Sequence, residues 1–177
     1  MARVKYLRRS DSANQAIFDR LERERKLPTA NIFLALTQAP EQLDGFLTYA
    51  NSLRNSPLSP RLRELAILTV GHLTNSRYEI AHHQSHGLKA GLTQAQLDAV
   101  PQFETSPLFT EQERAVMAYA RESTLKVDVD AATWGRVAAF LGEPELIALV
   151  LVVGWYNSGV RIMAGLDIEL EIGRAHV

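Results

Sequence analysis

Residues 59–92, SPRLRELAILTVGHLTNSRYEIAHHQSHGLKAGL, contain the pattern that decides the fold. Ser59 followed by Pro60 is typical of a helix start, because serine caps the first turn and proline fits the first helical position. Apolar residues recur at helical spacing over residues 61–74, and a second helical pattern covers residues 77–90. Since only two residues separate these patterns, we expect two adjacent helices that pack closely against each other.

Helical signals also dominate outside this stretch. Thr93 with Gln96, and Thr110 with Glu113, have the spacing of a capping box, in which two side chains close the first turn of a helix. The other helices that we expect cover residues 11–26, 31–39, 41–55, 93–101, 110–126, 130–142 and 144–166. The alternating apolar residues of 166–172 predict at most one short extended tail. The sequence therefore predicts an all-α fold of eight or nine helices.

Composition excludes several classes of protein. The chain has 177 residues, of which 46% are hydrophobic and 22% are charged, and its formal net charge is -1. These values are typical of a globular domain and leave no basic surface for nucleic acid or anionic lipid. The basic clusters at residues 3–9 and 20–26 are short, and the second alternates with glutamates. We expect neither a nucleic-acid nor a membrane partner.

The chain has no cysteine, which excludes disulfides, thiolate metal sites and thiol redox chemistry. Its N-terminus lacks the apolar core of a signal peptide. The longest apolar run, residues 146–156, is shorter than the ~18 residues that span a bilayer. This run therefore predicts a buried core helix, and we expect a cytoplasmic protein.

The NSPLSP sequence of residues 55–60 marks a natural boundary between two parts. Residues 1–58 are expected to form an N-terminal helical arm packed on the core. Residues 59–177 contain nearly all of the side chains that point to chemistry, and we expect them to form the functional domain.

The most unusual feature is the concentration of histidines near the middle of the chain. Four of the five histidines lie within residues 72–86. At about 100° per residue, one helix face of roughly 100° contains Glu79, His82, His83 and His86. Because Glu79 precedes His83 by four residues, its carboxylate can hydrogen-bond the imidazole, set its tautomer and raise its basicity. This spacing indicates a proton-transfer site.

Glu64, on the preceding helix, is a second candidate carboxylate. It shares a stripe with Ile67, Leu68 and Gly71, which predicts an inward orientation. A buried carboxylate needs a partner, because burial alone is costly and raises its pKa. A histidine of the next helix would supply that partner, and Gly71 would allow the two helices to approach closely.

Two other interpretations of the histidine helix stay open. Its polar face can lie in water or at an interface between subunits. It can also bind a divalent metal through Glu79, His82 and His86, because two histidines four residues apart with a carboxylate one turn earlier resemble the ligands of zinc sites. The pattern lacks the glutamate that directly follows the first histidine of an HExxH motif.

The last long helix contributes further candidates. Three residues, Trp155, Tyr156 and Asn157, interrupt an aliphatic sequence and either pack in the core or line a pocket. Arg161, near the end of this helix, can bind a substrate carboxylate. A helix-end or intersubunit ion pair is an equally consistent role for Arg161.

Residues 59–100 resemble the carboxymuconolactone decarboxylase / AhpD-like family. A capped R-E-L helix, a short junction, an E-x-x-x-H helix and an A-G-L-T end follow one another at fixed distances. GWYNSGVRIMAGLDIELE, residues 154–171, is a looser second match. The resemblance implies an AhpD-like helical bundle with additional N-terminal helices. It also implies a small-molecule substrate and a homo-oligomer, which is a dimer, trimer or hexamer in this family.

In the AhpD-like branch of the family, a C-x-x-C pair works with a glutamate and a histidine in peroxide reduction. Glu64 and His83 match that glutamate and histidine. The two cysteine positions fall on Ser76 and Glu79, and the intervening histidine position falls on Tyr78. Serine and glutamate do not form a disulfide, so we expect no thiol peroxidase activity.

In the decarboxylase branch, the corresponding helix carries E-x-x-x-H without cysteines, as Glu79 and His83 do here. That branch removes carbon dioxide from a carboxylated muconolactone during the catabolism of aromatic acids. The resemblance therefore implies a lyase without metal or organic cofactor, in which Glu64, Glu79 and His83 are the catalytic residues. A member that kept the fold and lost catalysis, and serves in binding or structure, is the alternative.

The same resemblance calls for a cation that holds the substrate carboxylate and for hydrogen-bonding groups around it. Arginines near both matching segments are candidates for the cation. The substrate-binding candidates are Tyr78, Arg61, Arg63, Trp155, Asn157 and Arg161.

Overall fold

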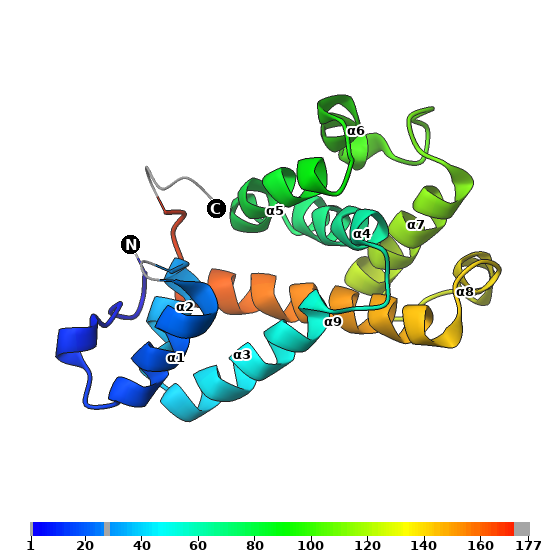
Figure 1. Ribbon diagram of the computed structural model, residues 1–177. Coiled ribbons are helices and arrows are strands. Elements are labelled where there is room, and N and C mark those ends of the chain that lie inside the picture. The colour runs from blue at the N-terminus through cyan, green and yellow to red at the C-terminus, as the bar shows by residue number, and fades with distance from the viewer. Residues whose placement is uncertain (1, 27–28, 172–177) are drawn as a thin grey trace. The chain divides into compact units, whose positions relative to one another are not determined.

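The computed structural model describes residues 2–26 and 29–171, and every regular element within these ranges is helical (Figure 1). The predicted all-α class is confirmed. The helices are α1 (Gln15–Arg25), α2 (Asn31–Leu36), α3 (Pro40–Arg54), α4 (Pro60–Leu73), α5 (Arg77–Lys89), α6 (Gln94–Ala99), α7 (Glu111–Lys126), α8 (Ala131–Ala138) and α9 (Glu143–Leu166). Short 3-10 turns cover Arg9–Asp11 and Val100–Gln102.

Local side chains start most of the helices as predicted. The Ser59 hydroxyl accepts a hydrogen bond from a first-turn amide of α4, and the Ser76 hydroxyl does the same for α5. Thr93 and Thr110 begin α6 and α7 with the expected capping boxes. These caps satisfy backbone N–H groups that have no partner inside the helix.

The first helix begins later than predicted. We expected residues 10–11 to cap it, but they belong to a single 3-10 turn. Asn14 is the cap, and its side-chain oxygen accepts a hydrogen bond from the Ile17 amide at 3.3 Å. Asparagine and aspartate are both good caps, so the residue types alone do not distinguish the two starts.

The chain divides into two compact units. One unit comprises the described residues up to Arg54 together with those from Arg161 onward, and the other comprises residues 55–160. The helix α9 runs through both units. The predicted division into a 1–58 arm and a 59–177 domain assigned the end of the chain to the second part. As a statement about independent domains, that division stays a prediction.

In the first unit, α1 and α3 share an apolar core that consists of Ile17, Phe18, Leu21, Leu43 and Leu47. Residues close to the two ends of the described chain contact each other in this unit. The Tyr6 hydroxyl donates to Glu169 Oε2 at 2.7 Å, and Asn31 Nδ2 donates to the Glu169 carbonyl oxygen at 2.8 Å. Residues 168–171 contain no strand, and Ile172, the last residue of the predicted alternation, lies outside the described residues.

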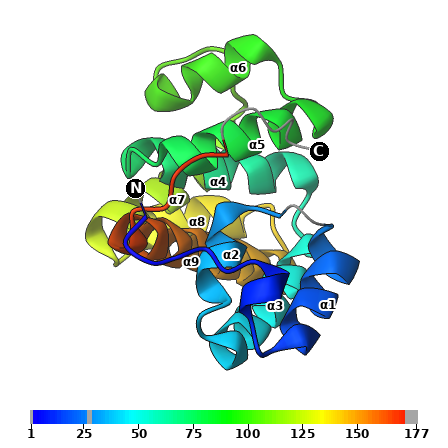
Figure 2. The same ribbon diagram turned by 90° about the vertical axis from the view of Figure 1, so that its left-hand side faces the viewer.

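In the second unit, α4 is the central helix and packs against α5 and α7 (Figure 2). All of its residues from Glu64 to Gly71 are buried, so the predicted inward orientation of Glu64 is confirmed. The core around α4 consists of Leu65, Leu68, Leu92, Leu97, Val100, Phe103, Phe109, Met117 and Ala118. Glu64 is therefore in the interior of this unit, on a helix that packs against α5.

The helix α9 differs from the predicted buried core helix. It has 24 residues, and its length and composition would suffice to cross a membrane, with 39% of the most apolar window buried inside the protein. One face is buried, as Leu149 and Val152 show. Another face exposes Ile147 and Val150. The prediction is therefore correct for one side of the helix and wrong for the other, because an apolar run by itself does not report how many sides are covered.

Candidate functional site

A tight turn between α4 and α5 brings the two helices together. Asn75 has a φ of 53°, in the left-handed region that asparagine tolerates better than most residues. The Ser76 amide then donates to the Gly71 carbonyl oxygen at 2.9 Å and closes the end of α4. A Cβ on Gly71 would lie 3.3 Å from Ile80 Cγ1, so the absence of a side chain there allows the close approach that we predicted.

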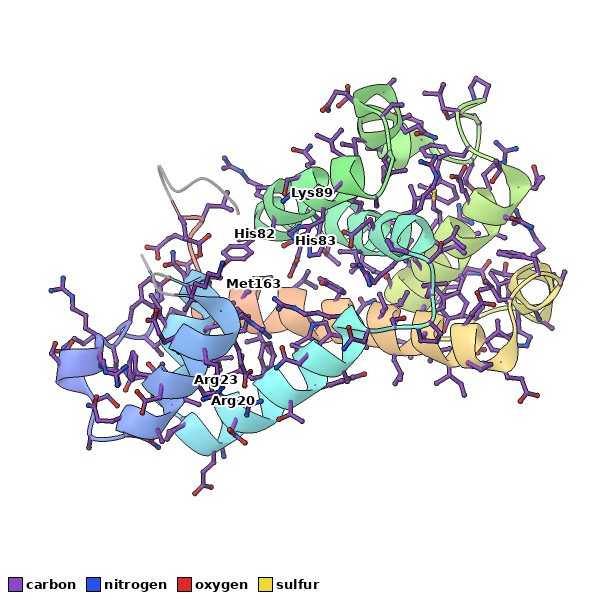
Figure 3. The ribbon with its side chains drawn as sticks, viewed as in Figure 1. Arg20, Arg23, His82, His83, Lys89 and Met163 are labelled. Carbon is purple, nitrogen blue, oxygen red and sulfur yellow. The ribbon has the colours of Figure 1, made fainter. Side chains whose placement is uncertain are left out.

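His83 lies between two carboxylates, one at each ring nitrogen. Its Nδ1 is 2.6 Å from Oε2 of Glu64, which belongs to α4. Its Nε2 is 3.5 Å from Oε2 of Glu79, one turn earlier on α5. Figure 3 labels His83 and its neighbour His82 on this helix. The structure thus brings together the three residues that we predicted to be catalytic.

All three side chains are largely removed from water. The exposed fractions of the side chains are 13% for His83, 4% for Glu64 and 11% for Glu79. Charges interact more strongly in such surroundings than in bulk water, and an unpaired charge is correspondingly more costly. The protonation of each member therefore depends on the other two.

The surroundings of Glu64 favour its ionised form. Burial alone raises the pKa of this carboxyl. The hydrogen bond from His83 and the positive charges of His83, Arg63 and His86 oppose that effect, and the net pKa lies below the ordinary value for glutamate. Arg63 Nε lies 3.4 Å from Glu64 Oε1. Glu64 is therefore the member of this group whose ionised, proton-accepting form is favoured.

The surroundings of Glu79 favour its protonated form. Burial raises the pKa of this carboxyl, and the negative charge of Glu64 raises it further, against the lowering effects of His83 and His82. On the other side, Glu79 Oε1 lies against Gly159 of α9, where a Cβ would be 3.7 Å away. This close glycine backbone leaves the carboxyl with little water to stabilise a charge.

The pKa values of the two glutamates are thus shifted in opposite directions, although both side chains lie next to His83. Because Glu64 contacts Nδ1 of the ring, Nε2 is the nitrogen that faces Glu79, the carboxyl with the raised pKa. Two titratable groups with pKa values shifted in opposite directions are a common arrangement for acid–base catalysis. The site can hold a proton at Glu79 and accept or deliver it through His83.

Aromatic rings surround the histidine, and one of them was missed as a site residue. The ring of Tyr156 on α9 meets the His83 ring edge to face, with centroids 4.9 Å apart and planes at 89°. His86 lies on the other side, with a centroid distance of 5.3 Å. In the sequence, Tyr156 was visible only as one of three residues that interrupt an aliphatic run. Its three-residue spacing from Gly159, on the same helix face, was the signal available.

The predicted substrate-binding residues lie in different surroundings. Tyr78 is buried and stacks on the ring of His82 at 4.5 Å. Asn157 donates through Nδ2 to Thr124 Oγ1 at 2.9 Å and to the Val153 carbonyl oxygen. The amide group of Asn157 therefore links α9 to α7.

The other aromatic and cationic candidates for substrate binding also lie in different parts of the structure. Trp155 is half-buried on α9. Arg161 is exposed and belongs to the first unit. Arg61 pairs with Glu113 Oε1 at 2.6 Å, which fixes the start of α7. Arg63 is thus the arginine candidate that lies beside the carboxylates of the second unit.

The metal interpretation receives no geometric support from the described residues. Within residues 2–26 and 29–171, no three histidine, aspartate or glutamate side chains are arranged to hold a metal ion, including Glu79, His82 and His86. His86 Nδ1 instead donates to the His82 carbonyl oxygen at 2.9 Å.

The opposite pKa shifts of the two glutamates predict opposite mutational effects on stability. A carboxyl with a raised pKa in the folded state contributes stability below its unfolded pKa and loses it as the pH rises through the folded value. We therefore expect Glu79→Gln to increase the free energy of unfolding at pH 8 by about 1–3 kcal/mol and to change it little at pH 5. Urea denaturation at the two pH values measures this difference.

Glu64→Gln is the matched control, because it alters the other buried carboxylate of the same histidine. Its lowered pKa contributes stability above the unfolded value and loses it as the pH falls, so this variant should be less stable than the wild type at pH 8. A Glu79→Gln variant that is less stable than the wild type at pH 8 would show that Glu79 is a stabilising carboxylate.

Comparison with known proteins places these residues inside a matching segment. Residues 38–122 match the model of the carboxymuconolactone decarboxylase family, and this range includes Glu64, Glu79 and His83. The uncharacterized protein YnjA of Escherichia coli is 26% identical over 119 residues, which represent 67% of this chain and 65% of that protein. The match thus spans slightly less than two thirds of the relative's own length.

Solved structures share the fold over nearly the whole chain. The debrominase Bmp8, in complex with 2,3,4-tribromopyrrole, superposes with a TM-score of 0.80 at 19% identity, covering 96% of this chain and 91% of that one. An alkylhydroperoxidase AhpD core protein from Ralstonia eutropha, an uncharacterized peroxidase-related protein, gives a TM-score of 0.79 at 14% identity, with 97% and 93% covered. At these identities the similarity concerns the fold, and it confirms the predicted AhpD-like architecture.

Proposed function

This chain belongs to the carboxymuconolactone decarboxylase / AhpD-like family, and we propose that it is a cofactor-independent acid–base lyase. Its substrate would be a small carboxylated lactone or a related intermediate from the breakdown of aromatic acids. Thiol peroxidase chemistry is closed to it, because the chain contains no cysteine.

The observation that carries this proposal is the placement of His83 between two buried carboxyl groups, of which Glu64 has a lowered pKa and Glu79 a raised one. Glu64 contacts Nδ1 of the ring, and Glu79 faces Nε2. Decarboxylation leaves a carbanion that must be protonated on carbon, and a buried acid with a raised pKa retains its proton to a higher pH than an ordinary glutamate does.

The proposed reaction has two steps. The bond between the ring carbon and the carboxylate breaks, carbon dioxide leaves, and the electron pair stays on the carbon, where conjugation with the lactone carbonyl stabilises it. The acid pair of Glu79 and His83 then delivers a proton to that carbon, and solvent restores the proton to the pair. Glu64 holds the ring orientation and stabilises its charged form.

Arg63 is the residue that we propose to hold the substrate carboxylate. It is the arginine next to Glu64, and a guanidinium binds a carboxylate through two parallel hydrogen bonds. The rings of Tyr156 and His86 beside His83 suit a flat, conjugated substrate. A protein of the same fold binds a small planar ring, 2,3,4-tribromopyrrole, which agrees with this size class.

The direct test is carbon dioxide release from carboxymuconolactone-type acids by the purified protein in deuterated water. We expect one equivalent of carbon dioxide for each product molecule and one deuterium at the carbon that carried the carboxylate. Release without deuterium at that carbon would contradict protonation by a solvent-exchanged acid. Absence of turnover across a panel of such acids would favour the alternative, a family member that binds without catalysis.

A further inference from the structure

Arg25, the last residue of α1, carries a guanidinium group whose hydrogen bonds are only partly satisfied. Its Nη1 donates to the Glu24 carbonyl oxygen at 3.1 Å, a contact typical of a cation at the end of a helix. Its Nε is buried and has no hydrogen-bond partner among the described residues. A buried donor without a partner costs free energy, which a ligand that accepts its hydrogen bond would recover.

The face of the same guanidinium lies on an aromatic ring. Cζ of Arg25 is 5.1 Å from the centroid of the Phe33 ring on α2. Phe33 in turn meets Phe46 of α3 edge to face, with centroids 6.3 Å apart. Stacking uses the face of the planar group, whereas hydrogen bonds to an oxyanion lie in its plane. The edge formed by Nε and Nη2, which we call the Nε edge, is therefore free to bind an oxyanion while the stacking persists.

A second arginine adds positive charge at this place. Burial lowers the pKa of Arg25, and the positive charge of Arg54 on α3 lowers it further, to about 10. The charge of Glu24 opposes that effect, but its two carboxylate oxygens already accept hydrogen bonds from Arg20 and Asn51. A negatively charged ligand at the Nε edge would offset both the burial of the guanidinium and its repulsion by Arg54.

The surroundings of the Nε edge also have an apolar side. Arg25, Phe33 and Phe46 are all half-buried, so each keeps part of its side chain in contact with solvent. A carboxylate forms two parallel hydrogen bonds with one edge of a guanidinium, and an apolar body next to it would cover the open ring surface. A bare inorganic anion would use the charge and leave the rings in water.

We propose that Arg25, Phe33 and Phe46 bind a small organic carboxylate. The carboxylate accepts hydrogen bonds from Nε and Nη2 of Arg25, and the apolar body of the acid lies against the two phenylalanine rings. The three residues come from three helices, α1, α2 and α3, and all belong to the first unit. The catalytic candidates belong to the second unit, so this inference does not depend on the proposed reaction.

Two-dimensional proton–nitrogen NMR spectra of the arginine side chains of the full chain test the proposal at the atom concerned. Benzoate is the probe, and the Nε–H signal that disappears in Arg25→Lys identifies Arg25. We expect benzoate to shift this signal with a dissociation constant below about 1 mM. Acetate, which has the same charge but almost no apolar body, should bind at least tenfold more weakly.

The backbone amide of Phe33 reports the same binding in the variants. Arg25→Lys should weaken the binding of benzoate at least tenfold, because lysine keeps the charge but lacks the planar pair of donors. Arg23→Gln is the matched control. Arg23, labelled in Figure 3, is an exposed arginine of the same helix, and its loss should leave the affinity unchanged. Far-UV circular dichroism should be the same for all three proteins.

Three results would contradict the proposal. Benzoate that leaves the Nε–H signal of Arg25 in place would exclude the site, whatever signals it shifts elsewhere in the chain. Equal affinities of the wild type and Arg25→Lys would remove the Nε edge as the binding group. Equal affinities for benzoate and acetate would remove the two phenylalanine rings from the site.

Discussion

His83→Gln is expected to lower the turnover number for decarboxylation of the substrate by roughly 10²–10⁴-fold, which is the usual contribution of a positioned general acid. Glutamine keeps a polar group of similar length but does not exchange a proton near neutral pH. The contacts with Glu64 and Glu79 therefore lose their proton-transferring centre, although the core around α4 is unaltered. Steady-state kinetics over pH 5–9, with carbon dioxide release as the signal, measure the effect.

His82→Gln is the control for this experiment. The two histidines are neighbours on α5, but His82 stacks on Tyr78, whereas His83 contacts the carboxylates. We expect His82→Gln to keep turnover within a few-fold of the wild type. Equal losses in the two variants would indicate a general effect on α5. Unaltered turnover in His83→Gln would remove His83 as the acid or base.

The second large effect is a gain of function. The double variant Ser76→Cys with Glu79→Cys is expected to reduce hydroperoxides through its thiols, which the natural chain does not contain. Ser76 caps α5, and a helix N-terminus lowers the pKa of a cysteine thiol placed there. Glu64 and His83 remain beside the second position to relay a proton.

The reaction in that variant balances as two thiols and one hydroperoxide giving a disulfide, an alcohol and water. Thiol titration measures it directly: two thiols per chain should be found before peroxide treatment and none afterwards. Each single cysteine variant is a control, because one cysteine cannot close the intramolecular disulfide. A double variant that keeps both thiols after excess peroxide would contradict the assignment of Ser76 and Glu79 to the redox positions.

The helical architecture was accessible from sequence because its signals are local. The caps at Ser59, Thr93 and Thr110 and the apolar spacing around them depend on residues only a few positions apart. The start of α1 was not accessible in this way. Several good capping residues follow one another between positions 10 and 14, and packing of α1 on α3 selects among the possible starts.

The candidate site of Glu64, Glu79 and His83 was predictable in part. The four-residue spacing of Glu79 and His83 places them on one helix face, and the short junction before α5 puts Glu64 on a neighbouring helix. The contribution of Tyr156 was not predictable, because this residue lies more than seventy positions after His83 in the chain. Its contact with His83 depends on the packing of α9, which no local pattern describes.

The sequence by itself determined the helical class, the resemblance to the carboxymuconolactone decarboxylase family, the exclusion of thiol chemistry and the pairing of a histidine with two glutamates. These follow from residue identity and short-range spacing, which folding does not alter. Only the tertiary structure decided that the pKa of Glu64 is lowered and that of Glu79 raised, because a pKa depends on burial and on charges from other helices. It also decided which side of α9 is covered, since an apolar helix buries only the faces that the rest of the fold reaches.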